Sequence, residues 1–177
     1  GSNVSFVLAQ KNGDEYVEFK MPDFIYSQRG TLSDIDLDGD LDLFIGSRSI
    51  PNQYPAPASG FLYRNDTKGS QIRFTDITDT HAPALKNMGM ITDAVWSDFD
   101  NDSQPDLVVS GEFMPIHFFH NEGGKLSKAE TGIEQFTGLW NSITAADIDN
   151  DGNTDYIVGN LGLNSFYKGT IEQPFSI

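Results

Sequence analysis

The sequence predicts an all-β protein built from repeated units of four short antiparallel strands. An acidic nine-residue stretch occurs three times, as DIDLDGDLD at 34–42, DFDNDSQPD at 98–106 and DIDNDGNTD at 147–155. A short apolar run follows each copy, turn signals separate the further runs, and no helical period extends over ten residues. Four strands in each ~50 residues are typical of a β-propeller blade.

Each unit reads as strand, acidic loop, strand, loop, strand, turn and strand. The segments GTLS, AVWS and ITAA precede the acidic loops, and LFIG, LVVSG and YIVGN follow them. The matching segments FLYRN at 61–65 and HFFHN at 117–121 then predict a third strand in two of the units. The copies begin at Asp34, Asp98 and Asp147, so their spacings are 64 and 49 residues, and an insertion-like loop at 47–60 explains the longer one.

The phase of the repeat predicts one β-propeller segment over residues 3–177, and we interpret residues 1–2 as the remnant of an expression tag. Within the segment we expect the outer hairpin of a preceding blade at 3–30, blades at 31–80 and 91–131, and a partial blade at 141–177. About two full and two partial blades are fewer than the four to eight of a closed ring. We therefore expect a partial propeller cut from a larger protein.

The composition excludes several classes of partner and chemistry. The chain has 26 Asp and Glu against 11 Lys and Arg, a formal charge of −15, which excludes nucleic acid as a partner. No apolar run approaches the ~20 residues that span a bilayer, so we expect no membrane insertion. The absence of cysteine excludes disulfides, thiol catalysis and cysteine-based zinc sites.

The acids at relative positions 1, 3, 5 and 9 of each copy predict a cation site. Carboxylates at positions 1, 3 and 5 of a tight loop converge on one centre, position 9 closes the shell, and the backbone carbonyl of position 7 can add an oxygen. Without a cation these carboxylates would repel one another strongly. Many oxygen ligands favour calcium over magnesium, and zinc is disfavoured because suitably placed His or Cys are lacking.

Two details qualify this prediction. His117 and His120 are three residues apart on a predicted strand, so we expect their side chains on opposite faces and not in one metal site. At position 6, the first and third loops have Gly39 and Gly152, whereas the second has Ser103. If this position requires a positive φ, serine costs roughly 1 kcal/mol, and the second site is expected to be the weakest.

The three loops and the LYRND…FTDIT segment at 62–78 resemble FG-GAP/VCBS repeats of the bacterial type, calcium-bearing blades found in integrin-α-like propellers. The resemblance implies a seven-bladed parent propeller, an extracytoplasmic location (secreted, periplasmic or cell surface) and about three structural Ca²⁺ ions. The sequence as given contains no signal peptide, which a trimmed chain would have lost. Carried over by position, the implied ligands are Asp34, Asp36, Asp38, Asp40, Asp42, Asp98, Asp100, Asp102, Gln104, Asp106, Asp147, Asp149, Asp151, Asn153 and Asp155.

We expect the protein not to be an enzyme. Paired carboxylates can hydrolyse glycosides, but almost all the clustered acids here are accounted for as metal ligands. Carboxylate shells that are saturated leave no coordination position for an activated water. No Ser-His-Asp arrangement, phosphate-binding glycine loop or zinc motif is present as a competing site.

The loops at the other end of the blades carry a candidate ligand face for a protein or a carbohydrate, namely Arg48, Tyr54, Phe113 and Trp140. The alternative is that these side chains pack between blades. Two functions stay open: a calcium-stabilised binding or adhesion module, and a purely architectural segment of a larger secreted or surface enzyme, for example a polysaccharide-processing one. Uncovered faces at the ends of an arc favour self-association of the chain.

Overall fold

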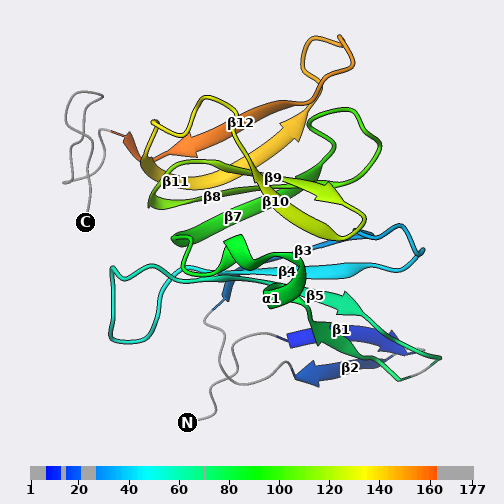
Figure 1. Ribbon diagram of the computed structural model, residues 1–177. Helices are drawn as coiled ribbons and strands as arrows, with labels where there is room; N and C mark the ends of the chain where they lie inside the picture. Colours follow the sequence, from blue (N-terminus) through cyan, green and yellow to red (C-terminus); the bar gives the residue numbers. More distant parts are fainter. Residues whose placement is uncertain (1–6, 13–14, 21–26, 70, 163–177) are drawn as a thin grey trace.

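The computed structural model describes residues 7–12, 15–20, 27–69 and 71–162. Antiparallel strands form a two-stranded, a four-stranded and a six-stranded sheet, and none closes into a barrel (Figure 1). The helices of the described residues are one turn of α-helix, α1 (Thr78–His81), and a 3₁₀ turn, η1 (Pro83–Leu85). None of the helices in this part of the chain is long and apolar enough to cross a membrane. The predicted all-β fold with partial propeller blades is confirmed.

The first four-stranded unit follows the chain in order, each strand pairing with the next. Its strands are β3 (Ser27–Ser33), β4 (Asp42–Ser47), β5 (Gly60–Asn65) and β6 (Phe74–Asp76). Every residue of β4 is buried, because Phe44 packs into one hydrophobic cluster while Leu43 and Ile45 pack into another. The uninterrupted apolar run after the first acidic loop is therefore a strand covered on both faces.

The second unit repeats this order and is joined to the third. Its strands are β7 (Met90–Ser97), β8 (Asp106–Met114), β9 (His117–Glu122) and β10 (Lys125–Ala129), and the third unit has β11 (Gly138–Ala146) and β12 (Asp155–Asn160). The end of β8 pairs with the start of β11, through Gly138 with Met114 and Leu139 with Glu112. This pairing merges the second and third units into one six-stranded sheet, which the repeat alone did not predict.

The N-terminal strands β1 (Val7–Asn12) and β2 (Glu15–Lys20) form an antiparallel hairpin with a sheet of its own. This hairpin lies within the segment expected to be the outer hairpin of a preceding blade, residues 3–30. Residues 3–6 and 21–26 of that segment, and residues 163–177 of the expected partial blade, lie outside the described part of the chain.

Two hydrophobic clusters stack the units on one another. The first contains Phe44 and Leu62 of the first unit together with Ile91 and Leu107 of the second. A Cβ on Gly46 would lie 2.4 Å from a methyl group of Ile91, so this close approach requires glycine. The second cluster joins the second and third units through Val108, Phe118 and Ile143.

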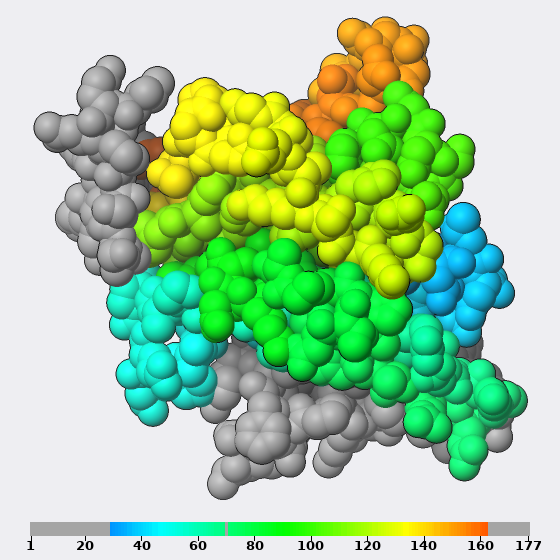
Figure 2. Space-filling model, in the orientation of Figure 1, coloured from blue at the N-terminus to red at the C-terminus, as the bar shows by residue number. Residues whose placement is uncertain are grey.

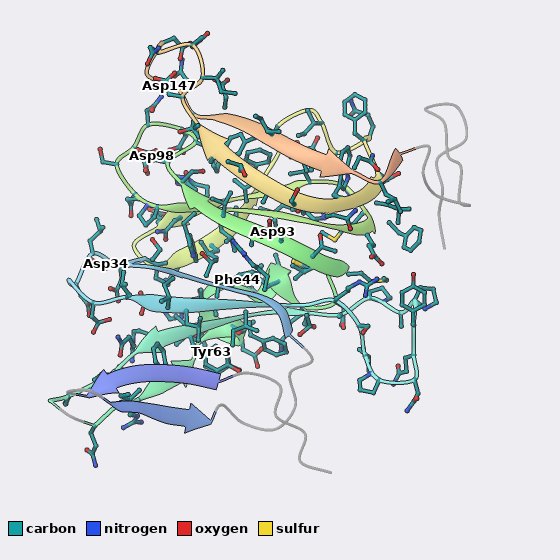
Figure 3. The ribbon with its side chains drawn as sticks, turned by 180° about the vertical axis from the view of Figure 1, so that it is seen from behind. Asp34, Phe44, Tyr63, Asp93, Asp98 and Asp147 are labelled. Carbon is teal, nitrogen blue, oxygen red and sulfur yellow. The ribbon has the colours of Figure 1, made fainter. Side chains whose placement is uncertain are left out.

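Asp93 on β7 connects all three units (Figure 3). Its Oδ1 lies 2.8 Å from Nε of Arg29 on β3, and its Oδ2 accepts a hydrogen bond from the backbone of Ile143 on β11, 3.0 Å away. Asp93 is 9% exposed, and a buried carboxylate needs such partners. The ion pair and the hydrogen bond therefore set how neighbouring units face each other, and with it the alignment of their loops.

Candidate metal centres

The three acidic loops join the first two strands of each unit and lie along the same edge of the molecule. They connect β3 to β4, β7 to β8 and β11 to β12. Figure 3 shows their first residues, Asp34, Asp98 and Asp147, one above another on this edge. In Figure 2 the same loops make up the right-hand margin, with the third projecting at the top.

Each loop is organised around the carboxylate at position 1. In the first loop, Asp34 accepts hydrogen bonds from the backbone N–H groups of Asp38 and Gly39, each 3.0 Å away. The equivalent bonds run to Asp98 from Asp102 and Ser103, and to Asp147 from Asp151 and Gly152. The same scaffold thus recurs in all three loops and follows from the local spacing of the acids.

The carboxylate at position 9 closes each loop from the strand side. Asp42 accepts hydrogen bonds from the backbone of Ile35 at 3.1 Å and of Asn65 at 2.8 Å, although it is only 1% exposed. Burial raises the pKa of Asp42 to about 6; the charges of Asp36 and Asp40 add to this effect and the two hydrogen bonds oppose it. A nearby cation would relieve the cost of keeping such a buried carboxylate ionised.

The second loop repeats this arrangement. Asp106 is fully buried and accepts hydrogen bonds from the backbone of Phe99 at 3.2 Å and of Asn121 at 2.7 Å. Burial raises the pKa of Asp106, and the charge of Asp100 adds to the shift. In the third loop, Asp155 accepts from the backbone of Ile148 at 3.0 Å.

Carboxylate oxygens converge in each loop. In three groups, one ligand atom from each member lies within 4.8 Å of those of the others: Asp34, Asp36 and Asp42; Asp98, Asp100 and Asp102; and Asp147, Asp149 and Asp155. Oδ1 of Asp36 and Oδ1 of Asp40 are shielded from solvent and have no hydrogen-bond partner. The three groups offer oxygen ligands alone, and the first also has a shielded, unpaired oxygen on Asp36; both features fit a hard divalent cation.

Several predicted ligands have other contacts. Asp38, Asp102 and Asp151 at position 5 accept hydrogen bonds from the backbone N–H of position 7. The side chains of Gln104 and Asn153 donate to Asp102 and Asp151. Burial raises the pKa of Asp40, and the charges of Asp38, Asp36 and Asp34 raise it further. The proposed coordination by the carbonyls of Asp40, Gln104 and Asn153 stays a prediction.

The backbone confirms that position 6 requires a positive φ, which is +97° at Gly39, +69° at Ser103 and +89° at Gly152. Position 4 is left-handed as well. Asn101 and Asn150 tolerate this conformation, whereas the first loop has Leu37, with φ +59°. The sequence therefore revealed the strain in the second loop and missed a comparable strain in the first.

Two asparagines that hold the loops were also missed. The side-chain amide of Asn65 donates to the carbonyl of Leu41 at position 8, and that of Asn121 donates to the equivalent carbonyl of Pro105. Their backbone N–H groups hold the position 9 carboxylates described above. Both asparagines end the matching FLYRN and HFFHN segments, and this shared place was the signal available in the sequence.

Contacts also run between loops. The side-chain amide of Asn101 donates to Oδ1 of Asn153 at 3.0 Å, and the hydroxyl of Thr154 donates to the carbonyl of Asp98 at 3.3 Å. These hydrogen bonds tie the second loop to the third. The two histidines of β9 do not share a site: His117 is 8% exposed, and the ring of His120 lies at the second loop.

At the other end of the units, two residues of the predicted ligand face are engaged within the chain. Arg48 forms an ion pair with Glu112, with 2.7 Å between Nη2 and Oε1. The indole N–H of Trp140 donates to the carbonyl of Met114, and its own carbonyl accepts from Thr92.

The other two predicted residues lie at or beside a groove. Phe113 lines a groove of about 400 Å³ together with Pro55 and Pro57. Tyr54 is 55% exposed and directly precedes Pro55. The role of all four residues as a ligand face stays a prediction.

The FG-GAP-like repeat family model matches residues 34–109 and 98–158, which together span all three acidic loops. No curated protein matches the chain, and no solved structure does. The family matches cover well over half of the chain and begin at the first residues of the first and second acidic loops. The chain therefore belongs to the FG-GAP-like repeat family and is a β-propeller-type module.

Proposed function

We propose that this chain is a calcium-stabilised propeller module of an extracytoplasmic protein, with a structural Ca²⁺ in each acidic loop. The observation that carries the proposal is the convergence of carboxylate oxygens in all three loops, with a shielded and unpaired oxygen on Asp36. The occurrence of FG-GAP-like repeats in extracellular proteins supports the location.

The physical argument concerns charge and concentration. Carboxylates a few ångströms apart repel each other, and a divalent cation converts this cost into cohesion between the two strands that each loop joins. Extracellular modules hold calcium with a Kd of ~10⁻⁴–10⁻³ M, which suits a calcium-rich milieu. Three Ca²⁺ ions would change the formal charge from −15 to −9, which reduces self-repulsion of the folded chain.

The test is thermal unfolding of the full chain with calcium and with a chelator. At a calcium concentration 100 times Kd, each site adds about 2.7 kcal/mol, and this should raise Tm by roughly 5–10 °C per site. Magnesium at the same concentration is the matched control and should have a much smaller effect, because it dehydrates reluctantly. For the Kd range above, this concentration is about 10–100 mM, and an unchanged Tm there would overturn the proposal.

For the biological role we propose the binding of a protein or glycan partner at the groove beside Tyr54 and Phe113. The exposed side chain of Tyr54 and a groove lined by Phe113 and two prolines support it. The architectural alternative is favoured by the intramolecular contacts of Arg48 and Trp140. Glycan-array and pull-down binding that is lost in Tyr54→Ala supports the binding role, and absence of any binding supports the architectural one.

A further inference from the structure

The turn between β5 and β6 forms a second groove, with a volume of about 570 Å³. Figure 2 shows this turn projecting at the lower right of the molecule. Three cations and one carboxylate give the groove an excess of positive charge, although the whole chain has a formal charge of −15. The groove is lined by Arg64, Asp66, Lys68, Gln71, Ile72 and Arg73.

The turn that forms the groove is longer than its counterpart in the second unit. There, residues 123–124 alone connect β9 to β10. In the first unit, residues 66–73 connect the equivalent strands, and most of the groove lies within them. The backbone N–H of Asp66 donates to the carbonyl of Arg73, 2.8 Å away, and this hydrogen bond closes the turn. The groove is therefore an ordered addition to the repeat, made in one unit.

The carboxylate of the groove is already paired. Oδ1 of Asp66 accepts a hydrogen bond from Nε of Arg64 at 3.0 Å and lies 3.0 Å from Nη2 of the same side chain. The hydroxyl of Thr75 donates to Oδ2. Lys68 and Arg73 are exposed, and neither forms an ion pair with another of the described residues. Two positive charges can therefore contact an anionic ligand from outside the chain.

The lining of the groove favours an acidic glycan among the anionic ligands. Guanidinium and ammonium groups form charge-assisted hydrogen bonds with oxyanions, and the side-chain amide of Gln71 can bond to hydroxyl groups. A protein partner would anchor large side chains in apolar pockets, whereas Ile72 is the apolar member of this lining. A nucleic acid would be repelled by the charge of −15 on the whole chain.

We propose that this groove binds a glycan that carries carboxylate or sulfate groups. Lys68 and Arg73 contact the acidic groups, and Gln71 contacts hydroxyl groups of the sugar. Arg64 stays paired with Asp66 and keeps that carboxylate from repelling the ligand. The inference does not depend on the ion in the acidic loops, because none of the lining residues is among the implied metal ligands.

The experiment titrates the full chain with short oligosaccharides by calorimetry, at a fixed calcium concentration. One oligosaccharide carries sulfate groups, one carries uronate carboxylates, and a neutral one of the same length is the reference. The wild-type chain should bind at least one of the two acidic sugars and not the neutral one. Added sodium chloride should weaken the binding, because salt screens exposed charges.

The double variant Lys68→Gln/Arg73→Gln should weaken this binding by at least about tenfold, because it removes two charge-assisted contacts. The matched control is Lys125→Gln/Lys128→Gln on β10, which takes the same total charge from the hairpin of the second unit. The control should bind the acidic sugar as the wild type does. Equal affinities of the two double variants would overturn the inference, because total charge and not the groove would then determine binding.

Three further outcomes would also overturn it. The first is a wild-type chain that binds neither acidic sugar, and the second is an oligoglutamate peptide that binds at least as tightly as they do. The third is binding that is lost in Tyr54→Ala and kept in Lys68→Gln/Arg73→Gln, which would place the glycan at the groove beside Tyr54. Stabilisation by calcium is read separately, from the melting of the same double variant, so the calcium proposal and the glycan inference can fail independently.

Discussion

The side-chain amide of Asn121 donates a hydrogen bond to the backbone carbonyl of Ile35, 2.8 Å away and 86 residues earlier in the chain. Ile35 is position 2 of the first acidic loop. The backbone N–H of the same Asn121 donates a hydrogen bond to Asp106, and its side-chain amide also donates to the carbonyl of Pro105. Asn121 is therefore bonded to the second loop as well. Its Oδ1 accepts from Gly124, and the side chain is fully buried. One asparagine therefore couples two candidate metal loops.

Asn121→Ala is expected to lower the free energy of unfolding by about 2–4 kcal/mol, because it leaves the buried carbonyl of Ile35 and the N–H of Gly124 unpaired. It should also weaken cation binding in the first loop. Asn65→Ala is the matched control, since Asn65 holds only its own loop and is less buried; it should cost about half as much. Urea denaturation at fixed calcium measures both variants. Equal losses would show that the link to Ile35 contributes nothing.

Ser103→Gly should stabilise the chain by roughly 0.5–1 kcal/mol, because it relieves the left-handed backbone at φ +69°. Leu37→Asn should act similarly in the first loop, where φ is +59°. The control is Ser127→Gly on the exposed face of β10, where glycine weakens a strand and should destabilise. Thermal melts decide the sign, and a loss of stability in Ser103→Gly would contradict the strain argument.

The buried imidazole of His117 predicts a dependence of stability on pH. Burial, together with the charge of Lys128, lowers the pKa of His117 to about 4, and the charge of Glu134 opposes this shift. The pKa of this histidine in the unfolded chain is near 6.5. Between pH 6.5 and pH 4 the unfolded chain therefore binds a proton that the folded chain does not. The free energy of unfolding falls as pH falls through this window, by up to about 3 kcal/mol.

His117→Phe should remove this pH-dependent part of the free energy of unfolding. The difference in free energy of unfolding between wild type and variant, measured from pH 7.5 to 4 with calcium present, isolates it from the titration of the acidic loops. A difference that stays constant across this range would refute the assignment to His117.

Trp140→Phe should lower the free energy of unfolding by about 1 kcal/mol, because it removes the hydrogen bond from the indole to Met114 where β11 meets β8. Phe136→Ala is the control. Phe136 is 44% exposed, and its removal should change stability by less than about 0.5 kcal/mol. Calorimetric melts compare the two variants. If Trp140→Phe is as stable as wild type, the indole is not a structural link. The prediction that Trp140 belongs to the ligand face is then favoured.

The sequence by itself determined the repeat, the acidic loops and the strands that they join. This information is local. The scaffold of a loop is made by acids two to eight residues apart, and a buried strand such as β4 is recognisable as an apolar run. The need for a positive φ at Ser103 could likewise be predicted, because it depends on the turn and not on what surrounds it.

Only the tertiary structure decided which groups from different units meet. The bonds from Asn121 to Ile35 and from Asn101 to Asn153 cross between units, as do the ion pairs of Arg48 and Arg29. No spacing in the sequence specifies such contacts, since they depend on how closely the sheets stack and how β8 pairs with β11. The contact of His120 with the second loop is of another kind, because it lies within one unit and follows from the pairing of β8 with β9.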